Sequence, residues 1–574
     1  MPFDFGEAVS SCPPQSRPVI QECTNIIQTT ALNDRSRIRA ALIFPNTHRI
    51  GTANLGFQYL YGYLDSHDRY SVESFFLPPE PGSRSHSPAV PRSVETGRPL
   101  SEFQVIAFSV AFENDYPTIP ALLVSAGSPP LQADRGPGRP VIIAGGGAVS
   151  MNPEPLADFV DLMFIGEAAE GSGADLFFST LADALAPDGC GTRDRAEFLR
   201  LFSAVPHVYV PSAYRFAYSG TGEIEAVEVL PGFPEKVRAA KRKAGQGQIP
   251  MSVLFSPDSE FGDSLLIETN RGCSRGCRFC TAGRLHFPVR YARMNELTGP
   301  VDKALADGRN IGLVGSDLAG HPDFEAILEH ITDRGGTFSL SSIRPEGLTD
   351  NVIRLMASVG SKTATLAPEA ASARMKRVIG KEIPSERFIE LIEKLVEAGI
   401  PNVRFYFMIG LPTETDDDIH EIVRFVKESR KAFTSASQPK GRIGRMGVQV
   451  NPFVPKPWTP FQWAAACPAN ILKKRIGILN KELRKLPNVV LRVESPREAL
   501  RQAVLSRGDR RVGDLILRMA QQGGSRSGLL GRTAKEPPFY AFRERGRDET
   551  FPWDAVDHGL TKESLWKSRL LAVC

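Results

Sequence analysis

The chain has 574 residues, and 42% of them are hydrophobic, which suffices for about two to four packed domains. Its 69 lysines and arginines nearly balance 65 aspartates and glutamates, so the net charge of +4 does not indicate a nucleic-acid-binding protein. No apolar run approaches the length of a membrane span, and the acidic N-terminus lacks the positive start of a signal peptide. Five cysteines are scattered without a disulfide framework, which predicts a reducing, cytoplasmic location: Cys12, Cys23, Cys190, Cys467 and Cys574.

The first part of the chain contains an extension and then short apolar runs that alternate with helical patterns. Residues 1–35 are polar and rich in proline, and we expect an N-terminal extension there. Over 36–190 we expect a helix at 56–64 and five strands, at 39–44, 70–77, 105–111, 141–144 and 160–165. Such an alternation predicts a parallel sheet with helices on both faces, a Rossmann-like (flavodoxin-like) α/β domain. A bridging region follows over 191–255, with a strand at 208–212 and a basic run at 236–243 that we interpret as a solvated linker.

A second alternation begins after this bridge and occupies 256–495. We expect six strands there, at 264–268, 311–314, 337–343, 363–366, 403–408 and 447–451. Each except the last is followed closely by a helical pattern, and six such units predict a partial (β/α)6 TIM-type barrel. The remaining residues, 496–574, are rich in arginine and glycine, and we expect them to form a C-terminal cap.

Three cysteines, Cys273, Cys277 and Cys280, follow the first strand of this second region with the spacing C-x3-C-x2-C. Three thiolates on one loop can hold three irons of a four-iron, four-sulfur cluster and leave the fourth iron open to a small molecule. The two arginines in this loop are expected to favour the thiolate form. Zinc is the alternative metal because His286 could supply a fourth ligand, and a zinc-stabilised, non-enzymatic interaction protein is therefore one alternative function.

The cysteine loop, together with Thr281-Ala282-Gly283, resembles the cluster loop of radical S-adenosylmethionine (SAM) enzymes. Two later segments, 366–370 and 405–415, are similar to the strand-four and strand-five segments of that family, and over about 36–520 the chain resembles its subgroup with an N-terminal cobalamin (vitamin B12)-binding-type domain. The resemblance implies a 4Fe-4S cluster, S-adenosylmethionine that is cleaved to a 5′-deoxyadenosyl radical, and cobalamin. It also implies an electron donor such as flavodoxin or ferredoxin, and methyl transfer or another C–H functionalisation on a substrate that the sequence does not name.

The resemblance also assigns SAM-binding roles to residues at the ends of the barrel strands. Gly315 and Ser316, in Gly315-Ser316-Asp317, match the segment that receives the SAM amine, and Glu369 would bond the ribose or the amine. Active sites of such barrels lie at the C-terminal ends of the strands, where these residues are expected. The other candidates are Ser342 and Arg344 after the third strand and Ile409 and Gly410 after the fifth. Arg344 could instead form a surface salt bridge, and the residues near Ile409 could be barrel core.

Cobalamin-binding residues are expected at strand ends of the first domain. His48 follows the first strand at the place where cobalamin domains carry the cobalt-ligating histidine, but Asn46 replaces the aspartate that normally holds the imidazole. Glycines at strand ends would let the corrin and its nucleotide tail approach the backbone, and these candidates are Gly145, Gly146, Gly166 and the adjoining Glu167. A first domain that has lost the cofactor, in an enzyme that acts on RNA or protein, is the other alternative.

Overall fold

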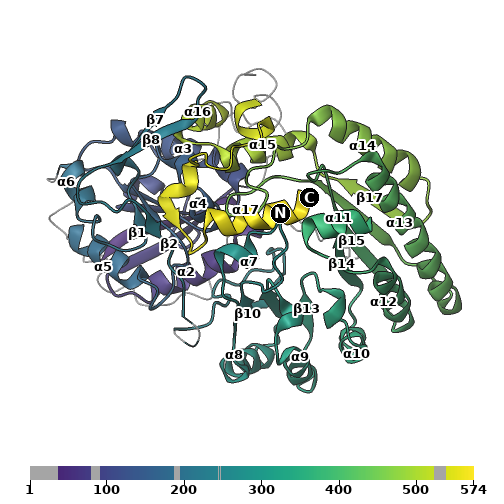
Figure 1. Cartoon of the computed structure of the whole chain (residues 1–574). Coiled ribbons are helices and arrows are strands. Elements are labelled where there is room, and N and C mark those ends of the chain that lie inside the picture. The colour runs from purple at the N-terminus through teal and green to yellow at the C-terminus, as the bar shows by residue number, and fades with distance from the viewer. Residues whose placement is uncertain are drawn as a thin grey trace, which may run out of the picture.

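The computed structural model shows two α/β halves that lie side by side, with a cap across them (Figure 1). It describes residues 37–78, 91–185, 194–243, 245, 247–521 and 538–573. The predicted extension at 1–35 lies outside the described residues, as do four of the five scattered cysteines, Cys12, Cys23, Cys190 and Cys574. No helix in the described part of the chain is both long and apolar enough to cross a membrane.

The first half is built on a six-stranded sheet in the order β2-β1-β3-β4-β5-β6. Its strands are β1 (Ile38–Thr47), β2 (Tyr70–Leu77), β3 (Val105–Ser109), β4 (Val141–Gly145), β5 (Leu162–Phe164) and β6 (Val208–Tyr209). The five predicted strands are present and parallel, and the strand expected at 208–212 is the antiparallel edge strand β6. The helices of this half are α1 (His48–Gly51), α2 (Leu55–Asp65), α3 (Thr118–Ser125), α4 (Gly147–Met151), α5 (Ala174–Ala184) and α6 (Arg195–Arg200).

The second half contains all six predicted barrel strands, which lie in two parallel arcs. The first arc has β10 (Leu265–Arg271), β12 (Ile311–Gly315) and β13 (Phe338–Leu340), and the second has β14 (Thr363–Glu369), β15 (Asn402–Ile409), β16 (Met446–Pro452) and β17 (Val489–Val493). A short antiparallel strand, β11 (Arg290–Tyr291), pairs with β10. The backbone N–H of Ile343 donates to Thr365 O at 3.4 Å and joins the two arcs. The predicted α/β fold class with a partial barrel is therefore confirmed.

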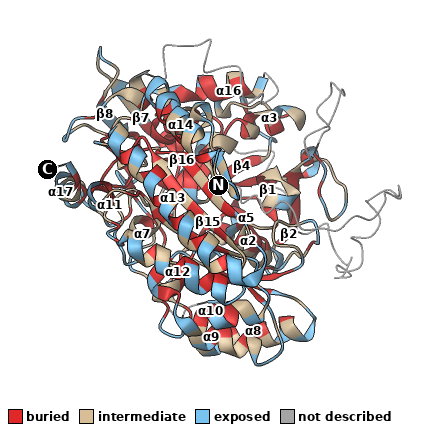
Figure 2. Ribbon diagram, turned by 90° about the vertical axis from the view of Figure 1, so that its right-hand side faces the viewer, coloured by how far each residue is buried: buried red, intermediate tan, exposed pale blue. Residues whose placement is uncertain are grey.

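Amphipathic helices cover the outer surface of these arcs, and Figure 2 shows buried residues in the strands and exposed residues on the outer faces of the helices. Strand β15 alternates between fully and half-buried residues, because one face packs on the helices and the other points into the barrel. The helices are α8 (Met294–Ala306), α9 (Phe324–Thr332), α10 (Asp350–Ser358), α11 (Ala373–Ile379), α12 (Ser385–Glu397), α13 (Asp416–Ser437) and α14 (Ala469–Leu483).

The C-terminal segment contacts both halves. It contains α15 (Pro496–Arg507), α16 (Gly513–Gln521), the short strand β18 (Val556–Asp557) and α17 (Lys562–Val573). Helix α16 packs against α3 of the first half, and α17 packs against α11 of the barrel (Figure 1). Strand β18 pairs with β9 (Val237–Arg238). The amide of Asn152 donates to Ser506 O at 3.1 Å, so the segment is tied to the first half by buried hydrogen bonds as well as by packing.

Candidate active site

A cavity of about 660 Å³ lies between the two halves. It is lined by the C-terminal ends of β3, β4 and β5 from the first half and of β10, β12 and β13 from the second. In parallel α/β sheets and barrels the ligand site lies at this end of the strands, so the cavity lies where the ligand sites of both halves meet. The strand-end residues that line it include Ala107–Ser109, Ile143–Gly147, Gly166–Ala168, Glu268, Gly312–Ser316 and Ser339–Ser341.

The three cysteines lie on one loop between β10 and the short helix α7 (Ala282–Leu285), and each is half-buried. No three His, Cys, Asp or Glu side chains within the described ranges lie close enough together to share one metal ion. The fourth ligand that zinc would need, His286, has its Nδ1 3.0 Å from Glu167 Oε1. Three separate thiols on one loop, each able to bind its own iron, fit an iron–sulfur cluster with one open iron better than a zinc site.

The expected effect of the loop arginines on the thiols is not found. Burial raises the pKa of both Cys273 and Cys280. Arg278 points away from the thiols, because its Nη1 donates to Val378 O at 3.1 Å near the C-terminus of α11. Carbonyl oxygens at a helix C-terminus attract a guanidinium group, which explains this orientation. Arg275 is exposed.

A buried carboxylate, Asp317, follows β12 beside the cysteine loop. Its residue is 3% exposed, and neither carboxylate oxygen has a hydrogen bond of ordinary geometry. Its charge contributes to the raised pKa of Cys273 after burial, and burial and the same charge raise the pKa of Tyr291. A buried carboxylate without well-formed hydrogen bonds is costly, so this position suits a ligand that brings N–H donors. Of the preceding residues, Gly315 lines the cavity, and so does Ser316, which is exposed.

Glu369, at the end of β14, lies on another side of the same loop. It has a positive φ of 65°, and its Oε1 lies 3.3 Å from Lys381 Nζ. Burial raises the pKa of Glu369 while Lys381 lowers it, and the Glu369 charge contributes to the raised pKa of Cys280. Two carboxylates from different strands, Asp317 and Glu369, thus flank the cysteine loop.

Glu369 and the remaining barrel candidates lie outside the cavity lining. Ile409 is fully buried in the barrel core, and the backbone N–H of Gly410 donates to Glu414 Oε2 at 2.5 Å. Ser342 is exposed, and the Nε of Arg344 lies 3.6 Å from Glu346 Oε2. In this structure Ile409 therefore belongs to the barrel core, and Arg344 is placed for a salt bridge with Glu346.

In the first half, the predicted glycines line the cavity but His48 does not. Gly146 and Gly166 have φ of 103° and 104°, and a Cβ would lie 2.5 Å from Val110 O and 2.3 Å from Ala240 O, so both positions require glycine. Gly145 lies beside them at the end of β4. The ring of His48 packs edge-on against Phe76 with 5.0 Å between centroids, and burial lowers its pKa.

Glu167 lines the cavity and connects the two halves. Its Oε1 accepts from Arg290 Nη2 at 2.6 Å and from His286, and its Oε2 accepts from the backbone N–H of Arg242 at 2.9 Å. Burial alone would raise the pKa of Glu167, but the hydrogen bond from His286 and the charges of Arg271 and Arg290 bring it well below its usual range. Sequence reasoning missed these partners, because they are distant in the chain and form no local motif.

Two sequence families match the two halves. "Radical SAM proteins, N-terminal" matches residues 56–211, and "Radical SAM superfamily" matches residues 267–426. The chain is 25% identical over 478 residues to an uncharacterized protein of Methanocaldococcus jannaschii, which covers 83% of this chain and 90% of the relative. It is 24% identical over 295 residues to tRNA-2-methylthio-N(6)-dimethylallyladenosine synthase of Thermobifida fusca, covering 47% of this chain and only 56% of that enzyme.

The solved structures that match the chain are more distant in sequence. The radical SAM methyltransferase TsrM from Kitasatospora setae, with cobalamin and a [4Fe-4S] cluster bound, has 12% identity and a TM-score of 0.49, covering 85% of this chain and 100% of TsrM. The cobalamin-dependent radical SAM enzyme OxsB, with aqua-cobalamin bound, has 15% identity and a TM-score of 0.42, covering 68% of this chain and 52% of OxsB. Both halves match radical SAM families, and the three cysteines lie within the second match, so the chain belongs to the radical SAM superfamily of enzymes.

Proposed function

We propose that the protein is a cobalamin-dependent radical SAM enzyme that transfers a methyl group or otherwise functionalises a C–H bond. The observation that carries this proposal is the cavity, which joins the glycine-rich strand ends of the first half to the barrel strands that flank the cysteine loop. Its volume of about 660 Å³ lies within the usual range for cofactor sites. The domain boundaries predicted from the sequence become part of this proposal, with the first half as the cobalamin-binding domain.

In this proposal Cys273, Cys277 and Cys280 hold the cluster. When bound, the cluster supplies the electron that cleaves SAM to a 5′-deoxyadenosyl radical. Asp317 would accept hydrogen bonds from the SAM amino group, since neither of its buried oxygens has a hydrogen bond of ordinary geometry. Glu369 would bond the ribose or the amine from another strand end.

The first half would hold cobalamin mainly through its backbone. Gly145, Gly146 and Gly166 lack side chains where the strands end, so a large ring can approach the main chain there. Phe164 and Phe178 also line the cavity and provide apolar surface for the nucleotide tail. These side chains exclude water and position the cofactor, and they take no part in proton transfer.

A cofactor analysis of the anaerobically purified and reconstituted protein tests this function. We expect about four irons per chain, one bound cobalamin after incubation with hydroxocobalamin, and 5′-deoxyadenosine when SAM and dithionite are added. Bound zinc without iron, together with no SAM cleavage, would instead support the alternative that the chain is a zinc-stabilised, non-enzymatic interaction protein. Iron and cleavage without cobalamin would favour an enzyme whose first domain has lost the cofactor and that acts on RNA or protein.

The cluster also needs an electron donor, and an acidic carrier such as flavodoxin or ferredoxin suits the surface beside the cysteine loop. Arg275 is exposed on this loop, and Arg377 is exposed on the adjoining helix α11. Cationic groups near the cluster would attract an acidic carrier and increase its rate of association. Such carriers are cytoplasmic, and we expect the same location for this protein.

Charge reversal at Arg275 should weaken reduction by the carrier alone. We expect Arg275→Glu to raise the KM for reduced flavodoxin about tenfold at low salt, with the difference shrinking as salt is added. The dithionite-driven rate of 5′-deoxyadenosine formation should not change. Arg354→Glu, at an exposed position on the barrel helix α10, is the matched control. An equal change in both assays would contradict a docking role.

A further inference from the structure

His286 brings an imidazole into the cavity from just beyond the cysteine loop. Its side chain is 35% exposed, and its Nδ1 lies 3.0 Å from Glu167 Oε1. The backbone of His286 is held against the cysteine loop, because a Cβ on Gly272 would lie 2.4 Å from His286 O. The position of this ring is therefore fixed from both sides, by the first half through Glu167 and by the loop that carries the cysteines.

The contact with Glu167 determines which ring nitrogen of His286 is available to bind a ligand. The carboxylate of Glu167 also accepts from Arg290 Nη2 at 2.6 Å and from the backbone N–H of Arg242 at 2.9 Å, so it acts as an acceptor toward every neighbour, including His286. Nδ1 then donates in this contact, which leaves Nε2 as the ring nitrogen that faces the cavity without a protein partner among the described residues. This assignment follows from the hydrogen-bond network. Within the described part of the chain no side chain or backbone group bonds to Nε2.

Two other histidines, His48 and His558, do not offer such a nitrogen. His48 packs against Phe76 outside the lining. His558 lines the cavity, but its Nε2 donates to Ser150 O at 2.8 Å, and its Nδ1 is buried from solvent without a partner. Burial lowers the pKa of His558 to about 4, so its ring stays neutral. Of the histidines in the cavity lining, only His286 has a partly exposed side chain and a carboxylate partner.

We propose that His286 Nε2 is the nitrogen ligand that the protein would offer to the cobalt of a corrinoid in the cavity, with Glu167 as a positioning residue. The inference rests on the proposed function, because it requires cobalamin to bind. A carboxylate that accepts the other ring proton fixes the tautomer of a metal-binding histidine and increases its basicity. The motif around His48 lacks that carboxylate, whereas the pair Glu167 and His286 supplies both groups from opposite halves.

Electron paramagnetic resonance of the full-length, reconstituted protein loaded with cob(II)alamin tests the ligand directly. A coordinating nitrogen splits each cobalt line, and labelling of the histidines with nitrogen-15 turns the triplet of ordinary nitrogen into a doublet. We expect this doublet in the labelled wild type. It should vanish in His286→Ala and His286→Gln while the iron content and bound cobalamin stay at wild-type levels, and it should persist in His48→Ala.

The positioning role of Glu167 has its own spectroscopic readout. Glu167→Gln retains the shape of the side chain but weakens ligation, since loss of such a partner costs about 10–100-fold in metal affinity. In the Glu167→Gln spectrum we expect a mixture of split and unsplit cobalt lines, with cobalamin still bound. In a separate experiment, nitrogen-15 imidazole added to unlabelled His286→Ala should restore a doublet.

Three outcomes would overturn the inference. Cob(II)alamin bound without a protein nitrogen would disprove His286 as ligand and leave the proposed function intact. A doublet that persists in His286→Ala would assign ligation to another histidine. Absence of bound cobalamin in the wild type would overturn both this inference and the proposed cofactor.

Discussion

Replacing Cys277 with alanine is expected to remove the cluster and to abolish cleavage of SAM. Each of the three thiols has a separate iron to bind, so two remaining ligands cannot complete the site. We expect iron to fall to background after reconstitution, and 5′-deoxyadenosine formation to fall by more than the roughly 100-fold that loss of an outer-shell partner costs a metal site. Iron analysis and product quantification under anaerobic conditions measure both effects.

Cys467→Ala is the matched control for this experiment. Cys467 is also a free, half-buried cysteine, with its Sγ 4.0 Å from Arg475 Nη1. Alanine keeps the Cβ atom that packs beside Gly410. We expect wild-type iron content and wild-type SAM cleavage in this variant. Retained cleavage in Cys277→Ala would disprove the assignment of the cysteine loop, and equal losses in both variants would indicate general damage instead.

The sequence predicts the main strands well because buried parallel strands are continuous apolar runs. The run around Leu42 is almost fully buried, as expected for a central strand with helices on both faces. The strands that sequence reasoning did not predict carry a weaker signal: in β17 half-buried residues alternate with exposed ones, and β11 has only two residues, one of them Arg290. Edge strands of this kind are defined by their pairing partners, which no local pattern reveals.

The candidate site divides in the same way into local and long-range features. The cysteines and Gly166 belong to short motifs, and the structure brings them to the strand ends that border one cavity. His286 and Glu167 are 119 residues apart, and only the packing of the two halves reveals their contact. His48 follows a recognisable motif, but Asn46 donates to Asp115 at 3.1 Å instead of orienting the imidazole. The replacement of the expected aspartate by Asn46 was therefore the informative signal, because it indicated that the His48 imidazole lacks its orienting partner.

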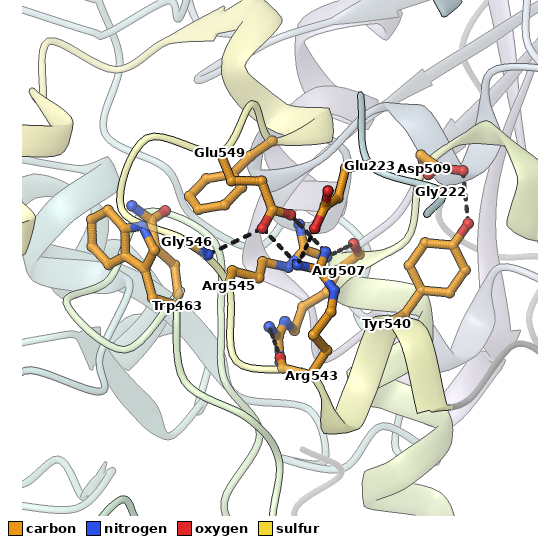
Figure 3. A network of polar contacts seen from close by, with 12 residues as sticks. Gly222, Glu223, Trp463, Arg507, Asp509, Tyr540, Arg543, Arg545, Gly546 and Glu549 are labelled. Atoms are coloured by element: carbon orange, nitrogen blue, oxygen red, sulfur yellow. Dashed lines mark hydrogen bonds and ion pairs between the residues drawn. The ribbon is translucent and has the colours of Figure 1, made fainter. Parts of the chain in front are cut away.

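The C-terminal cap contains a cluster of three arginines, of which Arg543 and Arg545 pair with the carboxylate of Glu549 and Arg543 also pairs with Glu223 (Figure 3). Arg543 binds Glu549 with two hydrogen bonds of 2.7 Å, and Arg545 Nη1 lies 3.8 Å from Glu549 Oε1. Arg507 is fully buried and donates to Ala541 O at 3.2 Å. Burial and the charges of Arg545 and Arg543 lower the pKa of Arg507. Glu549, with Glu223 beside Arg543, thus offsets a concentration of positive charge that has little access to water.

We expect Glu549→Gln to destabilise the cap by about 3–5 kcal/mol, because Arg545 loses its ion-pair partner and Arg543 keeps only Glu223. A loss of about 3 kcal/mol corresponds to a more than hundredfold increase in local opening, so amides over 543–551 should exchange at least about a hundredfold faster. The matched control is Asp548→Asn, whose side chain is 97% exposed and 4.0 Å from Arg547 Nε. It should change stability by less than about 1 kcal/mol.

The difference between wild type and Glu549→Gln should also depend on pH in a defined direction. Burial would raise the pKa of Glu549, but the hydrogen bonds and charges of Arg543 and Arg545 lower it below its usual value. A carboxyl group with a lowered folded-state pKa stabilises the protein above its unfolded pKa of about 4.3, and this stabilisation is lost as the pH falls through the folded value. The difference in amide exchange between wild type and Glu549→Gln should therefore be constant from about pH 8 to pH 5. It should disappear below about pH 4. Equal exchange in the two variants at pH 7 would show that Glu549 does not offset the arginine charges.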